Sequence, residues 1–547
     1  MFKPSRRQFL TAGAASLALA GLSGCATQGA AGTSAADVVR RTPAASSSAV
    51  QLLFYADTHA QWLPVISHSV ANHLGPMSLL GQAPYFTEYN RLAELGITSG
   101  DSRVAWLTAS GARQAGGVRM GGYAALAKAL EQQRVQWGAD ACLTLEGGQC
   151  WNGSGLAELT AGRYAPLSSH WLGAEVRIAS EEQQIWPQGY PRLYSEFARP
   201  VLDTGNPVAF FDKAGMKIAV VGVPNQPLNL SRIQYLSHIQ QQVLQAGSQA
   251  DWVVVLSDAG TNSDLWLAKE LQGVDLILSS RGQDLWPQAV QAPIPVCFAG
   301  SQGQGYFAIT LESKNSKRVV NARFHPVLTD QSEVMPAVAE QIQRLRSAHA
   351  GWLDLPLAEA PGWLYRRDAL AGSWDQLIAE ALKTTRAELT LAPGLRHGLA
   401  VAPGQVITRD HLLSLTAGYN SRVFQVTADP QQLQARLEAG ADQLLSDDWY
   451  LHSSEDMPRL TGSAYVLRYQ AVAGQRISEL QWPASSTRNR ARVAGWSTHY
   501  RGEGQPLWQL MESWLRQRSS AWHLPPLELP SLAFVEGHPG WHPEAVQ

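Results

Sequence analysis

Short apolar runs, rich in Val, Ile and Leu and bounded by Gly, Asp or Ser, recur between residues 49 and 330. These runs are 51–55, 141–145, 217–223, 252–256 and 274–278. Runs of this length and composition are typical of buried strands. Helical patterns lie between them, for example at 122–136 and 232–246. The alternation predicts a layered α/β domain, with functional groups in the loops just past the strand ends.

The chain of 547 residues is too long for a single core. A connecting helix is expected at 331–350, and a second domain at 351–540. Residues 26–48 are rich in Ala, Gly, Ser and Thr and show no apolar period, so they predict a flexible tether.

The N-terminus has features of an export signal. Residues 5–10 (SRRQFL) have the twin-arginine form, and the weakly apolar run 11–22 is too short to span a bilayer. Residues 22–25 (LSGC) are similar to a lipobox, which predicts a signal peptide at 1–25 and a lipid on Cys25. Because Ala26 follows, we expect an anchor in the outer membrane facing the periplasm. The alternative is an ordinary signal peptide with a chance cysteine.

Composition narrows the partners and the redox chemistry. A formal net charge of −2 leaves no basic excess, so a nucleic-acid partner is not expected. Beyond Cys25 there are three cysteines, Cys142, Cys150 and Cys297. An oxidising compartment permits one disulfide among them, and three buried thiols are the alternative. No CxxC or Cys/His zinc spacing is present.

Polar segments follow several of the predicted strands. They are Asp57-Thr58-His59, 147–154 (GGQCWNGS), 256–260 (LSDAG) and 279–284 (SSRGQD). They resemble the D-x-H, G-G-D, S-H and G-H-x-H motifs of the calcineurin-like metallophosphoesterase and 5′-nucleotidase superfamily. Segments 363–367 (WLYRR), 372–378 (GSWDQLI) and 391–398 (LAPGLRHG) are similar to motifs of its SoxB-type thiosulfohydrolases. The resemblance implies a layered β-sandwich flanked by helices, plus a C-terminal 5′-nucleotidase-like α+β domain.

The resemblance also implies two manganese ions held by about seven ligands, which polarise the substrate and supply a hydroxide. Only Asp57 and His59 keep ligand types, and both belong to the same ion. The other five expected ligand positions carry different residues, which are Gln149, Ser180, Asp258, Arg281 and Gln283. We expect a vestigial pair, or else one divalent ion, manganese or zinc, on Asp57, His59 and Asp258.

Three residues of the degenerate site carry separate expectations. The Arg281 guanidinium is hypothesised to fill the old metal pocket and to pair with Asp57 or Asp258. Glu182 keeps the acid of the family's G-[NH]-x-E segment, as a catalytic residue or its vestige, whereas a lone carboxylate is more often a solvated surface group. Cys150 is either a buried thiol or a reactive thiol in the cleft.

The second domain contributes a candidate binding set. Arg366, Arg367 and Arg396 are expected to recognise an anion, with Asp456 in the loop that shapes the cleft. The alternative for Arg367 is a structural pair with Asp368 or Asp375. Apolar walls are expected from Tyr365, Trp374 and Tyr450. In the family this domain closes over the substrate-bearing arm of a carrier protein.

Loss of ligands beside a preserved second domain predicts a catalytically degenerate SoxB-like protein without a cofactor. It would be lipid-anchored and would bind a Sox-type sulfur-carrier protein of thiosulfate oxidation. One alternative is an active thiosulfohydrolase or related hydrolase with a remodelled metal site. Another is a periplasmic nucleotide- or phosphoester-binding protein.

Overall fold

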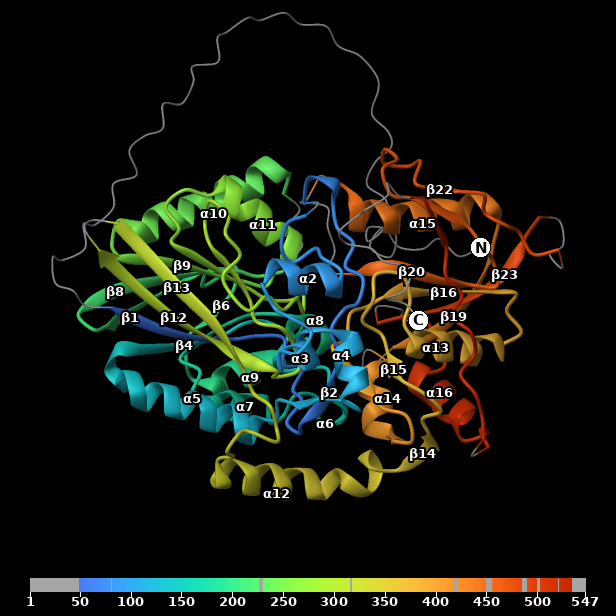
Figure 1. Ribbon diagram of the computed structural model, residues 1–547, viewed down its shortest axis with the longest axis horizontal. Coiled ribbons are helices and arrows are strands. Elements are labelled where there is room, and N and C mark those ends of the chain that lie inside the picture. Colours follow the sequence, from blue (N-terminus) through green and yellow to red (C-terminus); the bar gives the residue numbers. More distant parts are fainter. Residues whose placement is uncertain are drawn as a thin grey trace, which may run out of the picture.

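The computed structural model describes residues 49–79, 81–225, 230–314, 317–416, 421–448, 455–484, 489–498, 502–519 and 521–533. The expected signal peptide, Cys25 and the tether lie outside these ranges, as do Tyr450 and Ser454. Two bodies lie side by side in Figure 1, and α12 (Pro336–Leu353) runs below them and connects them along the chain. No helix within the described ranges is long and apolar enough to cross a membrane.

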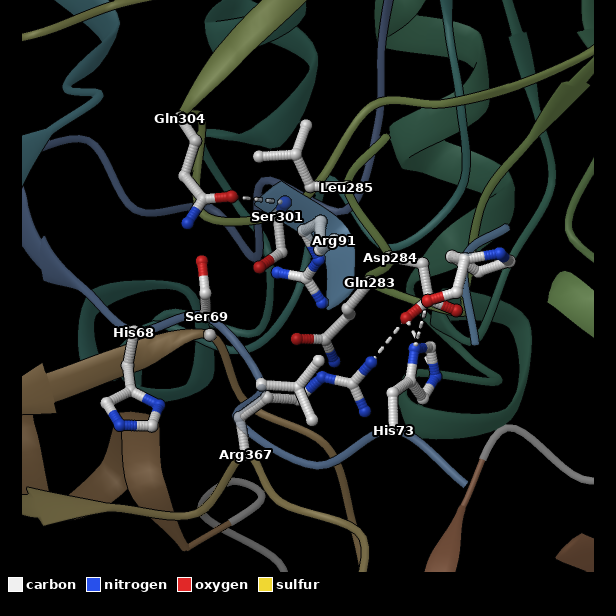
Figure 2. Close-up of a pocket in the computed structure, with 13 residues that line it drawn as sticks. His68, Ser69, His73, Arg91, Gln283, Asp284, Leu285, Ser301, Gln304 and Arg367 are labelled. Atoms are coloured by element: carbon white, nitrogen blue, oxygen red, sulfur yellow. Dashed lines mark hydrogen bonds and ion pairs between the residues drawn. The ribbon is translucent and has the colours of Figure 1, made fainter. Parts of the chain in front are cut away.

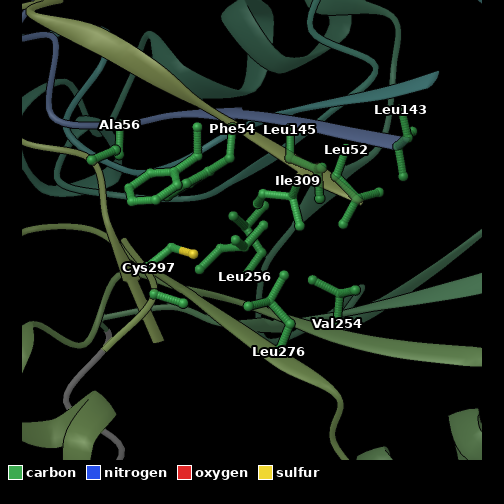
Figure 3. Packing of buried hydrophobic residues seen from close by; sticks show 14 of the residues in the cluster. Leu52, Phe54, Ala56, Leu143, Leu145, Val254, Leu256, Leu276, Cys297 and Ile309 are labelled. Carbon is green, nitrogen blue, oxygen red and sulfur yellow. The ribbon is translucent and has the colours of Figure 1, made fainter. Parts of the chain in front are cut away.

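The first body is a sandwich of two sheets. One sheet has the order β13-β12-β1-β4-β5-β6, with β1 (Val50–Tyr55), β4 (Cys142–Glu146), β5 (Val176–Ile178), β6 (Val201–Leu202), β12 (Gly305–Lys314) and β13 (Lys317–Pro326). The other has the order β11-β10-β9-β8-β7, with β7 (Val208–Lys213), β8 (Met216–Val223), β9 (Trp252–Ser257), β10 (Leu276–Ser279) and β11 (Val296–Phe298). Fully buried side chains such as Leu52, Leu145 and Leu256 fill the space between the sheets (Figure 3). Burial of this apolar face holds the sandwich together.

Helices cover both outer faces of the sandwich. On the first sheet pack α5 (Tyr123–Trp137), α7 (Ala165–Leu172), α9 (Tyr190–Phe197) and α12. On the second pack α10 (Arg232–Gly247) and α11 (Thr261–Glu270). Short helices lie in the connections: α3 (Val104–Leu107), α4 (Ala109–Gln114), α6 (Gly155–Leu159) and α8 (Glu182–Ile185), with 3-10 turns at Met77–Leu79 and Ala139–Ala141. The predicted α/β layering is confirmed, and each predicted strand is present within about two residues of its expected ends.

The second body is built on a sheet of order β19-β23-β16-β20. These strands are β16 (Leu389–Gly394), β19 (Arg422–Ala428), β20 (Asp456–Thr461) and β23 (Ala491–Ser497). One face carries α13 (Ser373–Lys383), α14 (Arg409–Leu415) and α16 (Leu507–Leu515), and α15 (Pro430–Leu445) covers the other. The smaller strands are β14 (Pro356–Glu359), β18 (Val406–Thr408), β21 (Val466–Arg468), β22 (Ile477–Ser478) and β24 (Ser531–Ala533).

A small four-stranded sheet joins the two bodies. Its order is β15-β17-β2-β3, where β2 (Val65–Ser67) and β3 (Arg119–Met120) leave the first body, and β15 (Leu364–Tyr365) and β17 (Leu399–Val401) belong to the second. The excursion between β2 and β3 also carries α2 (Glu88–Glu94). It therefore places polar side chains of the first body at the seam between the bodies. Strands of two or three residues leave no readable period in the sequence, so this sheet was not predicted.

Candidate functional site

The candidate site lies where parallel strands of both sheets end. β1 runs parallel to β4, and β9 runs parallel to β10, so their carboxyl ends point to the same edge of the sandwich. The segments just beyond them are 57–59, 147–150, 258 and 280–284. The structure thus brings together the predicted site residues of the first body.

Asp57 organises the loop that follows β10. Its carboxylate oxygens accept the backbone N–H groups of Arg281, at 2.8 Å, and Gln283, at 3.0 Å. Burial raises the pKa of Asp57 well above its usual range, although the two N–H donors act in the opposite direction. Asp57, Arg281 and Gln283 all have positive φ, of 48°, 75° and 54°. The hydrogen bonds from Arg281 and Gln283 to Asp57 hold this strained loop backbone in place. Strain of this kind is typical of functional sites.

His59 is buried beside Asp57, and its Nε2 atom has no hydrogen-bond partner among the described residues. Its ring lies 6.0 Å from that of His397, which comes from the second body. Burial and nearby Arg281 lower the pKa of His59 to about 4, so the ring is neutral at pH 7. A Cβ atom on Gly153 would lie 2.8 Å from His59 Nδ1, so this position tolerates only glycine.

A hydrogen-bonded chain connects three substituted ligand positions. The Gln149 side chain donates from Nε2 to Ser180 Oγ at 2.8 Å, and Ser180 donates to Asp258 Oδ2 at 2.7 Å. The other Asp258 oxygen accepts from Ser280 at 3.3 Å. Burial raises the pKa of Asp258 to about 7, against the lowering effect of Arg281 and Ser180. These side chains satisfy one another at positions where metal ligands were expected.

The Arg281 guanidinium was expected to pair with Asp57 or Asp258, but it hydrogen-bonds to neither of them. The guanidinium instead pairs with Glu181, at 2.7 and 2.9 Å, and its Nε can donate to Asn225 at 2.6 Å when the side-chain amide of Asn225 is turned to present its oxygen. The prediction was wrong because Asp57 is occupied by the backbone of the same loop and Asp258 by hydroxyl groups. The Arg281 side chain is 13% exposed and that of Glu181 is 36% exposed, so the pair lies at the rim of the site.

Glu182 is fully buried, so the solvated surface reading of this carboxylate is wrong. It accepts from Arg177 at 2.6 Å, from the Ser180 backbone at 3.1 Å and from Tyr194 at 2.9 Å. Arg177 also pairs with Glu146 at 2.9 Å. Glu182 therefore closes the loop after β5 within an ionic cluster. Its Oε2 atom has no hydrogen-bond partner among the described residues, and its role as a catalytic residue or its vestige stays a prediction.

The three cysteines in the described ranges, Cys142, Cys150 and Cys297, are buried and free. The disulfide alternative is therefore not found. Burial raises the pKa of Cys150 well above its usual range, with Glu146 adding to the effect. A thiol held protonated is a poor nucleophile, so the buried-thiol reading holds for Cys150.

Arg366 is a structural residue of the second body. Its guanidinium donates to Asp375 at 2.8 Å, to the Leu415 carbonyl at 2.9 Å and to the Pro393 carbonyl at 3.4 Å. All of its nitrogens are thus engaged within the second body, and the anion-recognising role expected for it stays a prediction. The expected apolar wall at Trp374 is likewise fully buried in the core of this body.

Arg367, Arg396 and Asp456 form a buried ionic cluster with Asp284 of the first body, and Figure 2 shows the pair of Arg367 and Asp284. Arg367 pairs with Asp284 through Nη2 and lies 3.5 Å from Asp456, so its expected pairing with Asp368 or Asp375 is wrong. Arg396 donates to Asp456 at 2.9 Å and to the Gly282 carbonyl at 3.2 Å. The cluster therefore links the loop after β10 to the second body.

Comparisons with known proteins agree with this architecture. The sulfate thiohydrolase SoxB of Thermus thermophilus, solved in complex with glycerol, superposes with a TM-score of 0.80 at 24% identity, over 90% of this chain and 98% of that one. A 5′-nucleotidase precursor, also from Thermus thermophilus, gives 0.67 at 14% identity, over 88% and 99%. No family model and no curated protein matches the chain. The chain has the 5′-nucleotidase and calcineurin-like metallophosphoesterase fold.

The donor set of this chain does not fit the metal pair that the fold implies. Both oxygens of Asp57 accept backbone N–H groups, and both oxygens of Asp258 accept hydroxyl groups. Gln149 is a neutral amide, which bridges two dications poorly. Among the described residues, no group of three or more His, Cys, Asp or Glu side chains could hold a metal ion.

Sequence reasoning missed several residues at the seam. Asp284 directly follows the last expected ligand position, but no family motif assigned it a role. His68, His73 and Arg91 come from the excursion between β2 and β3 and line one pocket together with Asp284 (Figure 2). The available signal was two histidines within six residues, closely following the Asp57–His59 segment.

Proposed function

We propose that this chain is a SoxB-like protein of thiosulfate oxidation that binds a sulfur-carrier protein without hydrolysing its sulfonated arm. One observation carries the proposal. The two-domain SoxB-like fold spans nine-tenths of the chain, while the expected ligand positions are hydrogen-bonded among themselves. A scaffold kept without its ion-binding donors suits binding better than turnover.

The rim pair supplies a means of binding. Hydrolysis requires an activated water and a group that stabilises the developing oxyanion, whereas Asp57 here is committed to its own loop. Arg281 is the cation at the rim, and Glu181 neutralises it. A sulfonate on a carrier cysteine would compete with Glu181 for this planar guanidinium, since both anions accept paired N–H donors. Such an exchange binds the arm and leaves its bonds intact.

The first test combines metal content with carrier binding. Protein exported by its own signal should contain less than about a tenth of an equivalent of manganese or zinc by elemental analysis. Calorimetry with a Sox-type carrier bearing an S-sulfonated cysteine should show binding that Arg281→Met weakens at least tenfold. Arg192→Met, which removes an exposed pair with Glu196, is the control and should bind normally. No interaction with any Sox-type carrier would sink the proposal.

A second candidate is a hydrolase with a single divalent ion on Asp57, His59 and Asp258, which would first have to leave their present hydrogen bonds, because they do not form a metal-binding group in the described structure. The unpartnered Nε2 atom of His59 favours it, because a buried neutral imidazole is a ready metal ligand. This function predicts saturable zinc or manganese binding near one equivalent. It also predicts sulfonate or phosphoester hydrolysis that His59→Ala abolishes.

The proposed setting is the periplasmic side of the cell envelope. We propose export through the twin-arginine route and a lipid on Cys25, because a lipid-anchored protein would meet a periplasmic carrier there. Cys25→Ala should move the protein from the membrane fraction to the soluble periplasm. Replacement of Arg6 and Arg7 by lysine should block export. Membrane retention of the Cys25→Ala protein would contradict the anchor.

A further inference from the structure

A small polar pocket lies at the seam between the two bodies, beside Gln283, Asp284 and Leu285 of the loop after β10 (Figure 2). The side chains that matter for its chemistry are His68, Ser69, Arg91, Ser301, Gln304 and Arg367. They come from the excursion between β2 and β3, from the loop before β12 and from the second body. Gln283, one of the expected ligand positions, and Asp284 also line the pocket, whereas Arg281 and Glu181 of the rim pair do not.

Two buried guanidinium groups keep unused donors at this pocket. Arg91 is 3% exposed and donates from Nη1 to the Leu107 carbonyl at 2.8 Å, while its Nε has no hydrogen-bond partner among the described residues. Arg367 is 2% exposed, and its Nη1 also lacks a hydrogen-bond partner within the described part of the chain. A guanidinium has donors only, so Arg91 Nε requires an acceptor from the pocket, and Arg367 Nη1, which lies 3.5 Å from Asp456, can still donate to one.

His68 supplies a third unpartnered side chain. Neither ring nitrogen of His68 has a hydrogen-bond partner among the described residues, although the residue is 3% exposed. Its ring stacks on Tyr365 with centroids 4.2 Å apart, which fixes the ring plane. Burial, with Arg113 and Arg367, lowers the pKa of His68 to about 3. The neutral ring therefore offers one N–H donor beside two cations.

The neighbouring carboxylates are committed to other partners. Asp284 pairs with Arg367, accepts from Thr261 and lies 3.3 Å from His73 Nε2. Glu88 accepts the backbone N–H groups of Ala109 and Ser110 at the start of α4. Burial lowers the pKa of Arg91 to about 10, even though Glu88 and Asp284 raise it. Asp284 and Asp456 are thus shared between Arg367 and Arg396, and Arg91 keeps an unused donor at the pocket.

We propose that this pocket binds a small inorganic anion, a halide or a small oxyanion, between Arg91 and Arg367. The Ser301 hydroxyl and the His68 ring supply the neutral donors around it, whereas the Ser69 hydroxyl donates to the Trp106 carbonyl at 3.1 Å. Ser301 Oγ packs directly against Gly398 of the second body, where a Cβ atom would lie 2.1 Å from it. The anion would link the bodies, and its binding does not depend on the function proposed above.

Anion titration of the full-length protein tests the site. The melting temperature is measured in sodium gluconate at fixed ionic strength, while sodium bromide, chloride or sulfate replaces the gluconate. A saturable rise of roughly 2 °C or more is expected with at least one of these anions. Crystals soaked in bromide should show an anomalous peak between Arg91 and Arg367. Absence of the peak, together with equal melting in every salt, would mean ordered water only and would overturn the proposal.

Two variants locate the effect at the pocket. Arg91→Met should abolish the anion-dependent rise, whereas Arg103→Met, at an exposed pair with Asp101, should keep it. Because Arg91 also supports the Leu107 carbonyl, Gly398→Ala is a second probe. It should displace Ser301 Oγ and weaken the anion at least fivefold while the protein remains folded. An unchanged anion response in both pocket variants would contradict the site.

Discussion

Removal of Arg367 should destabilise the seam between the two bodies. Burial disfavours the charged form of Asp284, but His73, Arg367 and Arg396 outweigh it and hold the pKa of Asp284 at about 2. Relative to an ordinary carboxyl this corresponds to about 2 kcal/mol of net stabilisation of the carboxylate. His73, with a pKa of about 4, is neutral at pH 7, so only Arg367 and Arg396 stabilise the Asp284 carboxylate there, and the net stabilisation is smaller than this figure.

Arg367→Met would leave Asp284 buried with its second arginine, Arg396, 3.7 Å away. Breaking a buried pair in this way costs about 3–5 kcal/mol. Chemical denaturation at pH 7, followed by tryptophan fluorescence, measures the loss. Arg192→Met removes an exposed ion pair and should cost less than about 1 kcal/mol. If Arg367→Met lowered the free energy of unfolding by less than the control Arg192→Met does, the conclusion that the Arg367–Asp284 pair stabilises the seam would be refuted.

Three further predictions concern the site itself. Gly148→Ala should destabilise the protein by about 1–3 kcal/mol in denaturation, because its Cβ would lie 2.0 Å from Asp258 Oδ1; Gly351→Ala, with open space around it, should be neutral or slightly stabilising. Burial raises the pKa of Asp258 to about 7, so between about pH 4 and 7 the folded protein binds one more proton at this residue than the unfolded chain does. This extra proton stabilises the folded state, and the stabilisation is lost as the pH rises through that window. Unfolding measured at pH 5 and pH 8 should show that Asp258→Asn reduces the dependence, and an unchanged slope would contradict the shift. Arg177→Met should cost about 3–5 kcal/mol, since it strands Glu146 and Glu182 together, and a loss below about 1 kcal/mol would count against the buried cluster.

The parts of the fold that repeat a pattern were readable in the sequence. β9 and β8 are continuous apolar runs because both of their faces are buried, between the sheets and beneath α10 and α11. The sheet that joins the two bodies was not readable. Its strands have two or three residues, and β2 finds its partner β17 more than 300 residues further along the chain. Such pairing depends on tertiary packing, for which a local pattern carries no signal.

The candidate site was predictable in position but not in connectivity. The strand ends identified Asp57, Gln149 and Asp258 as neighbours, because parallel strands present their carboxyl ends together. Which carboxylate would meet Arg281 depended on the competition for each acceptor. Backbone N–H groups had already taken Asp57, which left Glu181 at the rim as the partner. A sequence shows which groups are present, but the partition of hydrogen bonds among them is fixed only by the folded geometry.

The retained Asp57 is therefore weak evidence for retained chemistry. Its carboxylate holds the loop through Arg281 and Gln283, and its own carbonyl accepts the backbone N–H of Gln302 at 2.8 Å. Loss of activity in an Asp57→Ala protein would follow from a collapsed loop as readily as from a lost ligand. His59 separates the two explanations, because its Nε2 supports no other group among the described residues. A change at His59 that alters metal binding while the melting temperature stays constant would identify a ligand, whereas equal effects of both substitutions on stability alone would identify a vestige.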